Sequence, residues 1–166
     1  MKLNIKKLLK EILLFVVMLF VVSNILSYLR SPELQNSSLP GIEATLIDGS
    51  AFNSREAEGK PLVVHFWATW CPVCKAEASN IQALSEEYEV LSIAVNSGSE
   101  DALRRYMQQN GYRFRVLNDA EGQWAGRFNV EVFPTTFIFD GKGELKFTEV
   151  GYTTTLGLKG RLGVLK

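Results

Sequence analysis

Cysteine and histidine are scarce in this chain of 166 residues, which has two cysteines and one histidine. So few cysteines exclude a scaffold held together by many disulfides, and the fold must rest on a hydrophobic core instead. A four-ligand zinc site on the cysteine pair would need two more partners, and one histidine with no further cysteine does not supply them. The chemistry of the two cysteines is therefore local.

An excess of positive charge is also missing. Lysine and arginine together number 18, as do aspartate and glutamate. From residue 31 onward there are 13 basic against 17 acidic residues, a net charge of about −4. A nucleic-acid partner is not expected, because its phosphate backbone favours a basic face. We interpret the one basic and aromatic cluster, GYRFR at residues 111–115, as a strand with a solvated face.

Charge is absent from residues 12–29, which read ILLFVVMLFVVSNILSYL. Eighteen helical residues at about 1.5 Å each cover about 27 Å, close to the hydrocarbon thickness of a bilayer. Four lysines precede this run and one arginine follows it, which by the positive-inside rule places residues 1–11 in the cytoplasm. The sequence therefore predicts a single transmembrane anchor over residues 12–29.

A cleaved signal peptide is the alternative for this segment. Its apolar region is usually shorter and ends in a small-x-small cleavage site, and no Ala-x-Ala follows here, so we favour an uncleaved anchor. Residues 30–40 are polar and bounded by proline, which indicates a short linker. In either case we expect the remainder of the chain in the periplasm or extracytoplasmic space of a bacterial inner membrane, where disulfides persist.

Residues 41–166 alternate between strand-like and helix-like segments. A D-G turn predicts a hairpin within residues 44–52, and the dense run PLVVHFW predicts a buried central strand. Further strands are expected at residues 90–95, 135–140 and 144–150, and helices at residues 76–89, 100–111, 120–130 and 153–165. This order predicts an α/β domain, a three-layer sandwich around a mixed β-sheet.

Cys71 and Cys74 follow the predicted central strand, at the sheet edge where open α/β folds usually hold their ligands. If the helix begins at the motif, Pro72 takes its first position and Cys74 lies one turn later on the same face as Cys71. The helix N-terminus then favours the thiolate of Cys71, and thiolate is the attacking form in disulfide exchange. This geometry predicts that Cys71 attacks and Cys74 resolves.

Two other uses of the cysteine pair remain open. Two thiolates alone suffice to hold Cu(I), and a buried structural disulfide needs no reactivity. His65 lies in the predicted strand and is more typical of a polar core residue than of a ligand. A redox couple is favoured, because a structural disulfide does not explain why the pair lies at a strand-to-helix junction beside Trp67 and Trp70.

The stretch FWATWCPVC, preceded by KPLVVH and followed by KAE, resembles the thioredoxin superfamily. More narrowly it resembles the membrane-anchored TlpA/ResA/DsbE-like proteins, and the likeness spans nearly all of residues 41–165, including VFPTTFIFD. The resemblance implies a thioredoxin-like fold and a thiol–disulfide oxidoreductase with no cofactor beyond its own disulfide. It also implies protein thiol or disulfide substrates and a membrane-embedded electron donor or acceptor. The CPVC motif and the anchor are nearest to the ScsD-like proteins associated with copper tolerance.

The same resemblance implies roles for five further residues. Pro134 would be a cis-proline facing the cysteines, Phe133 would offer its backbone to the substrate, and Trp70 would form part of the rim. Glu77 matches a glutamate that assists proton transfer to or from the cysteines. His65 replaces the buried aspartate of cytoplasmic thioredoxins, which makes it a possible proton relay with a charge that responds near neutral pH.

Overall fold

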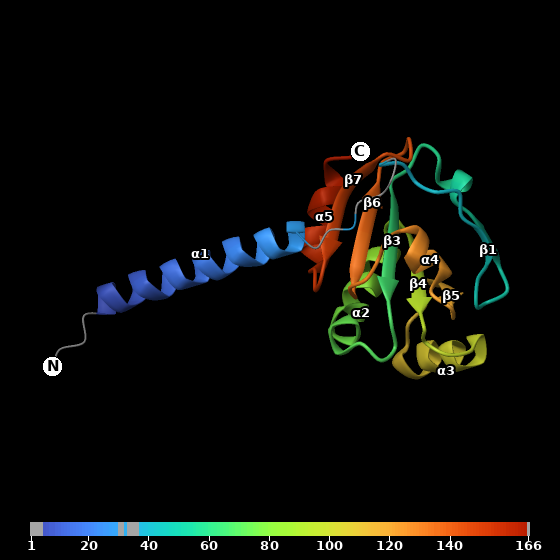
Figure 1. The fold of residues 1–166 in the computed structure, drawn as a ribbon, viewed down its shortest axis with the longest axis horizontal. Helices are drawn as coiled ribbons and strands as arrows, with labels where there is room; N and C mark the ends of the chain where they lie inside the picture. The colour runs from blue at the N-terminus through green and yellow to red at the C-terminus, as the bar shows by residue number, and fades with distance from the viewer. Residues whose placement is uncertain (1–4, 30–31, 33–36, 166) are drawn as a thin grey trace. The chain divides into compact units, whose positions relative to one another are not determined.

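A computed structural model describes residues 5–29, 32 and 37–165 of the chain. The chain divides into two compact units, residues 1–31 and residues 32–166. The first contains α1 (Ile5–Leu29), a 25-residue helix (Figure 1).

Helix α1 covers the whole segment that the sequence assigned to a membrane anchor. Within the described residues, no helix has both the length and the apolar character required to cross a bilayer. The transmembrane anchor at residues 12–29 is therefore not confirmed and stays a prediction. The first four residues of the expected cytoplasmic segment lie outside the described residues, as do residues 30–31 and 33–36 of the expected linker.

The second unit is built on a five-stranded sheet with the order β5-β4-β3-β6-β7. The strands are β3 (Leu62–Trp67), β4 (Glu89–Val95), β5 (Arg115–Asp119), β6 (Thr135–Phe139) and β7 (Leu145–Val150). β3 pairs with β4 in parallel and with β6 antiparallel, so the sheet is mixed and β3 is central, as the sequence predicted. Figure 1 shows these strands within the unit.

A short hairpin of β1 (Glu43–Thr45) and β2 (Ala51–Asn53) precedes the sheet. The D-G pair forms its turn, with Gly49 at a φ of 85°. This confirms the expected hairpin. The 3-10 helix η1 (Ser54–Ala57) then leads into β3.

The helices are α2 (Pro72–Ser85), α3 (Glu100–Asn110), α4 (Gln123–Arg127) and α5 (Thr155–Gly163). Their ends follow local signals: Ser99 caps α3 through its side chain, Gly111 ends α3 in the left-handed conformation, and Thr154 caps α5. Helix α4 is shorter than residues 120–130 predicted, because Gly122 before it and Asn129 after it adopt the left-handed conformation, with φ of 73° and 52°. The carboxylate of Asp119 accepts the N–H groups of Trp124 and Ala125 at the start of this helix.

Successive side chains of β3 point to opposite faces of the sheet, so the hydrophobic core is divided into two clusters. Val63 and Trp67 pack with residues of α2, α3 and α5 on one face. Val64 and Phe66 pack on the other face with residues of α4 and the hairpin. Helices therefore cover both faces of the sheet, and the expected layered α/β domain is confirmed.

The interpretation of residues 111–115 as a strand is wrong. Gly111 caps α3, and the N–H of Tyr112 donates to the carbonyl of Met107, so these residues still belong to the helix end. Phe114 is buried in the core rather than lying along a solvated strand. Strand β5 begins only at Arg115, the last residue of that segment.

Candidate active site

Cys71 is the N-cap of α2, and Pro72 is its first helical residue, as the motif predicted. The sulfur of Cys71 accepts the backbone N–H of Cys74 at 3.2 Å, so one of the free N–H groups of the helix start points at it. An N–H donor and the positive end of the helix dipole both stabilise negative charge on this sulfur. The position favours Cys71 as the attacking thiolate.

Cys71 and Cys74 are joined as a disulfide, with their Cα atoms 5.3 Å apart. Cys71 is 5% exposed and Cys74 is 1% exposed. Both cysteines therefore lie mostly beneath the protein surface, and Cys71 is the more accessible of the two. This difference agrees with an attacking Cys71 and a resolving Cys74.

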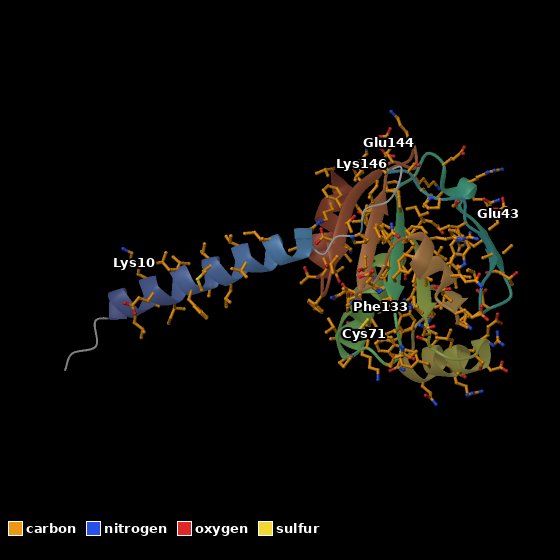
Figure 2. The ribbon with its side chains drawn as sticks, viewed as in Figure 1. Lys10, Glu43, Cys71, Phe133, Glu144 and Lys146 are labelled. Carbon is orange, nitrogen blue, oxygen red and sulfur yellow. A yellow bond between two sulfur atoms is a disulfide. The ribbon has the colours of Figure 1, made fainter. Side chains whose placement is uncertain are left out.

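A proline loop faces the disulfide. The peptide bond between Phe133 and Pro134 is cis, as the resemblance implied. The carbonyl oxygen of Phe133 lies 3.8 Å from the sulfur of Cys71, and Figure 2 shows the two residues close together. A peptide backbone docked against this loop would lie beside the reactive sulfur.

Exposed apolar side chains surround this position. Trp70 is 56% exposed, Val73 43% and Val132 38%. The ring of Trp70 meets that of Phe133 edge-on, with 5.8 Å between centroids. These side chains form an apolar rim that can pack against the residues flanking a substrate cysteine.

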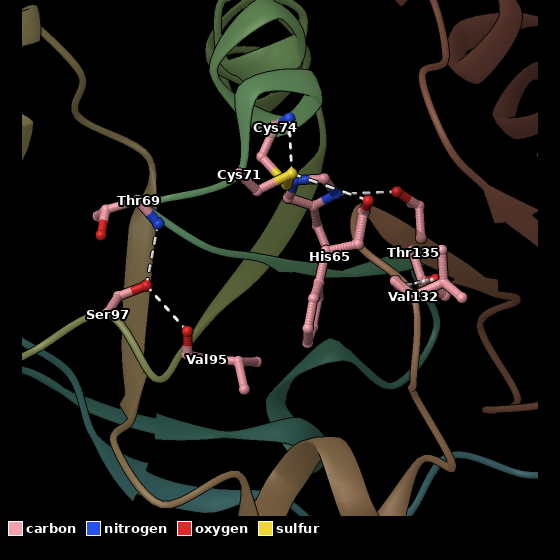
Figure 3. The surroundings of a disulfide bond; sticks show 10 residues. His65, Thr69, Cys71, Cys74, Val95, Ser97, Val132 and Thr135 are labelled. Carbon is pink, nitrogen blue, oxygen red and sulfur yellow. Dashed lines mark hydrogen bonds between the residues drawn. A yellow bond between two sulfur atoms is a disulfide. The ribbon is translucent and has the colours of Figure 1, made fainter.

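The loop after β4 holds the segment that precedes Cys71. The hydroxyl of Ser97 accepts the N–H of Thr69 at 3.0 Å and donates to the carbonyl of Val95 at 2.9 Å (Figure 3). The indole N–H of Trp70 donates to the carbonyl of Asn96 at 3.1 Å. The approach to the helix N-terminus is thus fixed by hydrogen bonds from a neighbouring strand end.

His65 lies on β3 and is 2% exposed, and Figure 3 draws it among the surroundings of the disulfide. Its Nδ1 is 2.9 Å from the hydroxyl oxygen of Thr136, its cross-strand partner on β6. Burial lowers the pKa of His65 from 6.5 to about 3, because the charged form loses its hydration. The imidazole is therefore neutral around pH 7, and its charge does not respond there.

Glu77 lies on α2, three residues after Cys74, and is fully buried. One carboxyl oxygen, Oε1, accepts the N–H of Thr153 at 2.8 Å. The other, Oε2, is buried with no hydrogen-bond partner among the described residues. The pKa of Glu77 is raised from 4.5 to about 7. Burial is the largest cause, the hydrogen bond from Thr153 lowers the pKa in part, and the charge of Glu149 adds to the increase.

Several residues of this site were missed from the sequence. Ser97 stands in a polar run after a buried strand, which is a usable signal for a site at that edge. Asn80 repeats the three-residue spacing of Cys74 and Glu77, which places it on the same face of α2. The backbone of Thr153 carried no signal, because only the folded chain brings it to α2.

Metal binding finds little support in the described part of the chain, where no three or more His, Cys, Asp or Glu side chains are grouped to hold an ion. The two sulfur atoms of Cys71 and Cys74 are bonded to each other in this state. A two-thiolate copper site would form only after that disulfide is reduced.

Comparison with known proteins places this site in a wider context. Residues 36–148 match the AhpC/TSA family. A thioredoxin-like protein of Haemophilus influenzae is 34% identical over 161 residues, covering 96% of this chain and 95% of that protein. The thiol-disulfide oxidoreductase ResA of Oceanobacillus iheyensis is 30% identical over 121 residues, covering 70% of this chain and 62% of that protein.

One solved structure is also similar to this chain. It is a secreted disulfide oxidoreductase of Mycobacterium tuberculosis described as homologous to DsbE of E. coli, with a TM-score of 0.66 and 28% identity, covering 75% of this chain and 96% of that one. Its fold agrees with the α/β arrangement found here. The chain belongs to the AhpC/TSA family, has a thioredoxin-like fold, and is a thiol–disulfide oxidoreductase.

Proposed function

We propose that this oxidoreductase exchanges disulfides with protein substrates outside the cytoplasmic membrane, through the Cys71–Cys74 pair. The observation that carries the proposal is the position of Cys71. Its sulfur lies at the N-terminus of α2, accepts the N–H of Cys74, and is 3.8 Å from the carbonyl of Phe133 beside a cis-proline. That arrangement combines a stabilised thiolate with a backbone wall for an extended substrate segment.

In the reducing direction, the Cys71 thiolate attacks one sulfur of a substrate disulfide. A Cys71–substrate disulfide forms, and the other substrate sulfur leaves as a thiolate that takes up a proton. Cys74 then loses its proton and attacks the sulfur of Cys71, which releases the second substrate thiolate and closes the Cys71–Cys74 disulfide. Two electrons pass to the substrate, and the oxidising direction is the reverse.

Glu77 is the proposed acceptor of the Cys74 proton. A general base works best when its pKa is close to the working pH, and the pKa of Glu77 is about 7. Its Oε2 has no hydrogen-bond partner among the described residues and is free to take a proton. His65 is less suited to this step, because a pKa of about 3 makes it a weak base.

The proposed anchor is α1 with its charge-free residues 12–29, and it rests on the sequence pattern. It would restrict the domain to partners at the membrane, including a membrane-embedded electron donor or acceptor. The secreted Mycobacterium tuberculosis relative supports an extracytoplasmic location. The direction of electron flow follows from the reduction potential: a value well below about −200 mV would indicate a reductase.

Replacing Cys74 with alanine tests the exchange reaction. Without the resolving thiol, Cys71 should stay bound to its substrates and give a ladder of mixed disulfides in cells. Non-reducing electrophoresis measures the adducts, and reductant should dissolve them. The double variant Cys71→Ala, Cys74→Ala is the matched control and should give none.

The competing function is copper handling by the two thiols. Absence of any adduct from the Cys74→Ala variant, together with retention of one Cu(I) per wild-type chain, would overturn the exchange mechanism.

A further inference from the structure

Residues 151–155, which comprise the connection between β7 and α5 and the first residue of α5, are hydrogen-bonded to α2, and we call them the strap. The N–H of Thr153 donates to Glu77 Oε1 at 2.8 Å. The carbonyl of the same residue accepts from the side-chain amide of Asn80 at 3.0 Å. Two side chains one helical turn apart on α2 thus bind both backbone polar groups of one strap residue.

The amide of Asn80 is held on both sides by the strap. Its Nδ2 also donates to the hydroxyl of Tyr152 at 3.1 Å. Its Oδ1 accepts from the hydroxyl of Thr155 at 3.0 Å. With Nδ2 and Oδ1 both bound, the amide has one orientation, and Thr153 is held between Tyr152 and Thr155.

The strap also reaches the proline loop. The N–H of Gly151 donates to the carbonyl of Pro134 at 2.8 Å. Gly151 has a φ of 91°, a left-handed conformation that turns the chain out of β7. The strap therefore connects the proline loop, which faces the disulfide, with the carboxyl group of Glu77.

Glu77 depends on the strap for its hydrogen bonding. The Thr153 N–H occupies Oε1, and Oε2 has no partner among the described residues. The charge of Glu149 on β7 acts on the Glu77 carboxyl group, and Cys74 lies one helical turn before it on α2. His65 on β3 is neutral at pH 7. Glu149 is paired with Arg161 of α5 at 2.5 Å.

We propose that Asn80 is a positioning residue for Glu77: by fixing the strap, it keeps the Thr153 N–H on Oε1 and leaves Oε2 as the oxygen that exchanges a proton with Cys74. This inference rests on the proposed role of Glu77 in disulfide exchange. The Thr153 N–H stabilises the carboxylate, so a loosened strap makes the carboxylate harder to form.

Stopped-flow mixing of the reduced full chain with the aryl disulfide known as Ellman's reagent tests this role. Attack by Cys71 releases one coloured thiolate and leaves a mixed disulfide, and attack by Cys74 releases the second. In the wild type, the rate of the second release should titrate near pH 7. In Asn80→Ala and in Thr155→Val, the midpoint should rise by about 0.5 to 1 pH unit, as expected for one weakened hydrogen bond to a carboxylate.

Gln82→Ala is the matched control, because Gln82 is an amide on the same helix that holds a different segment, through the N–H of Arg113 at 2.7 Å. Its midpoint should equal that of the wild type. Thr155→Val replaces only the hydroxyl with a methyl group of similar size, so it provides the test if Asn80→Ala fails to fold.

Two outcomes separate this inference from the proposed function. If Glu77→Gln abolishes the titration while Asn80→Ala and Thr155→Val keep the wild-type midpoint, the positioning role of Asn80 is wrong. If Glu77→Gln itself keeps the wild-type titration, Glu77 is not the proton acceptor and the positioning role of Asn80 fails with it. A midpoint raised equally in Gln82→Ala would also overturn the inference, since the effect would not depend on the strap.

Discussion

Glu77 and His65 are buried acid and base side chains whose pKa values move in opposite directions for one reason. Burial removes water from the charged form, which raises the pKa of the carboxyl group to about 7 and lowers that of the imidazole to about 3. Both groups are therefore mostly neutral at about pH 6. Of these two groups, Glu77 is the one that changes charge close to neutral pH, so a pH response of the oxidised site in that range would come from Glu77 and not from His65.

The pH dependence of the free energy of unfolding should reflect the raised pKa of Glu77. Between pH about 4.5 and about 7 the folded state keeps the Glu77 proton that the unfolded state has lost. The free energy of unfolding should therefore fall as the pH rises through this window, by on the order of 2 to 3 kcal/mol. Glu77→Gln should flatten that fall, as measured by urea unfolding of the oxidised protein at several pH values.

Glu58→Gln is the control for this measurement, because Glu58 is exposed. It should keep the wild-type slope. An unchanged slope in Glu77→Gln would show that Glu77 does not hold a proton in the folded state at pH 6.

At the scale of elements, the turn between β6 and β7 packs against the entry to β3. The N–H of Gly59 donates to the carbonyl of Gly141 at 2.8 Å. A Cβ at Gly141 would lie 2.7 Å from the carbonyl carbon of Gly59, a backbone atom that cannot swing away. This position requires glycine because two backbones meet there.

Gly141→Ala should therefore destabilise the domain, by about 1 to 3 kcal/mol, since the turn or the entry to β3 must shift. Chemical denaturation measures the loss. Gly126→Ala is the matched control: Gly126 lies in α4, and a Cβ there meets nothing within 4 Å. It should be neutral or stabilise by about 0.5 to 1 kcal/mol. Equal effects of the two substitutions would contradict a backbone clash at Gly141.

Elements with strong local signals were predictable. The apolar run of β3, the serine and glycine ends of α3, and the helix start at Cys71 all follow from neighbouring residues. The start of β5 was not predictable, because the cap of α3 extends into the residues interpreted as a strand. Hydrophobic periodicity cannot separate a helix cap from a strand over so few residues.

The candidate site likewise has one part that could be predicted from the sequence and one part that could not. Cys71, Cys74 and the cis bond before Pro134 lie in motifs that can be read from the sequence. The contacts of Asn80 and Glu77 with Thr153 join residues more than seventy positions apart. No local pattern carries such a contact, so only the packing of α5 and β7 reveals it.

At the scale of the whole chain, the two compact units predict separable behaviour. Residues 32–166 contain both clusters of the hydrophobic core. We expect the fragment 32–166 to unfold cooperatively, to keep disulfide exchange and to be recovered in the soluble fraction.

The full chain should instead sediment with membranes and resist extraction by alkaline carbonate, if residues 12–29 form the anchor. Cell fractionation of the two forms measures this difference. Recovery of the full chain as a soluble protein would contradict the anchor and leave the exchange chemistry untouched.

The small exposure of the disulfide has a kinetic consequence. Cys74 is 1% exposed and Cys71 is 5% exposed, beside a single proline loop. A substrate and the partner that regenerates the enzyme must therefore enter by the same opening and react with the same sulfur. They cannot occupy the protein together, so each turnover alternates between them, and double-reciprocal plots at several partner concentrations should be parallel, as in a ping-pong reaction.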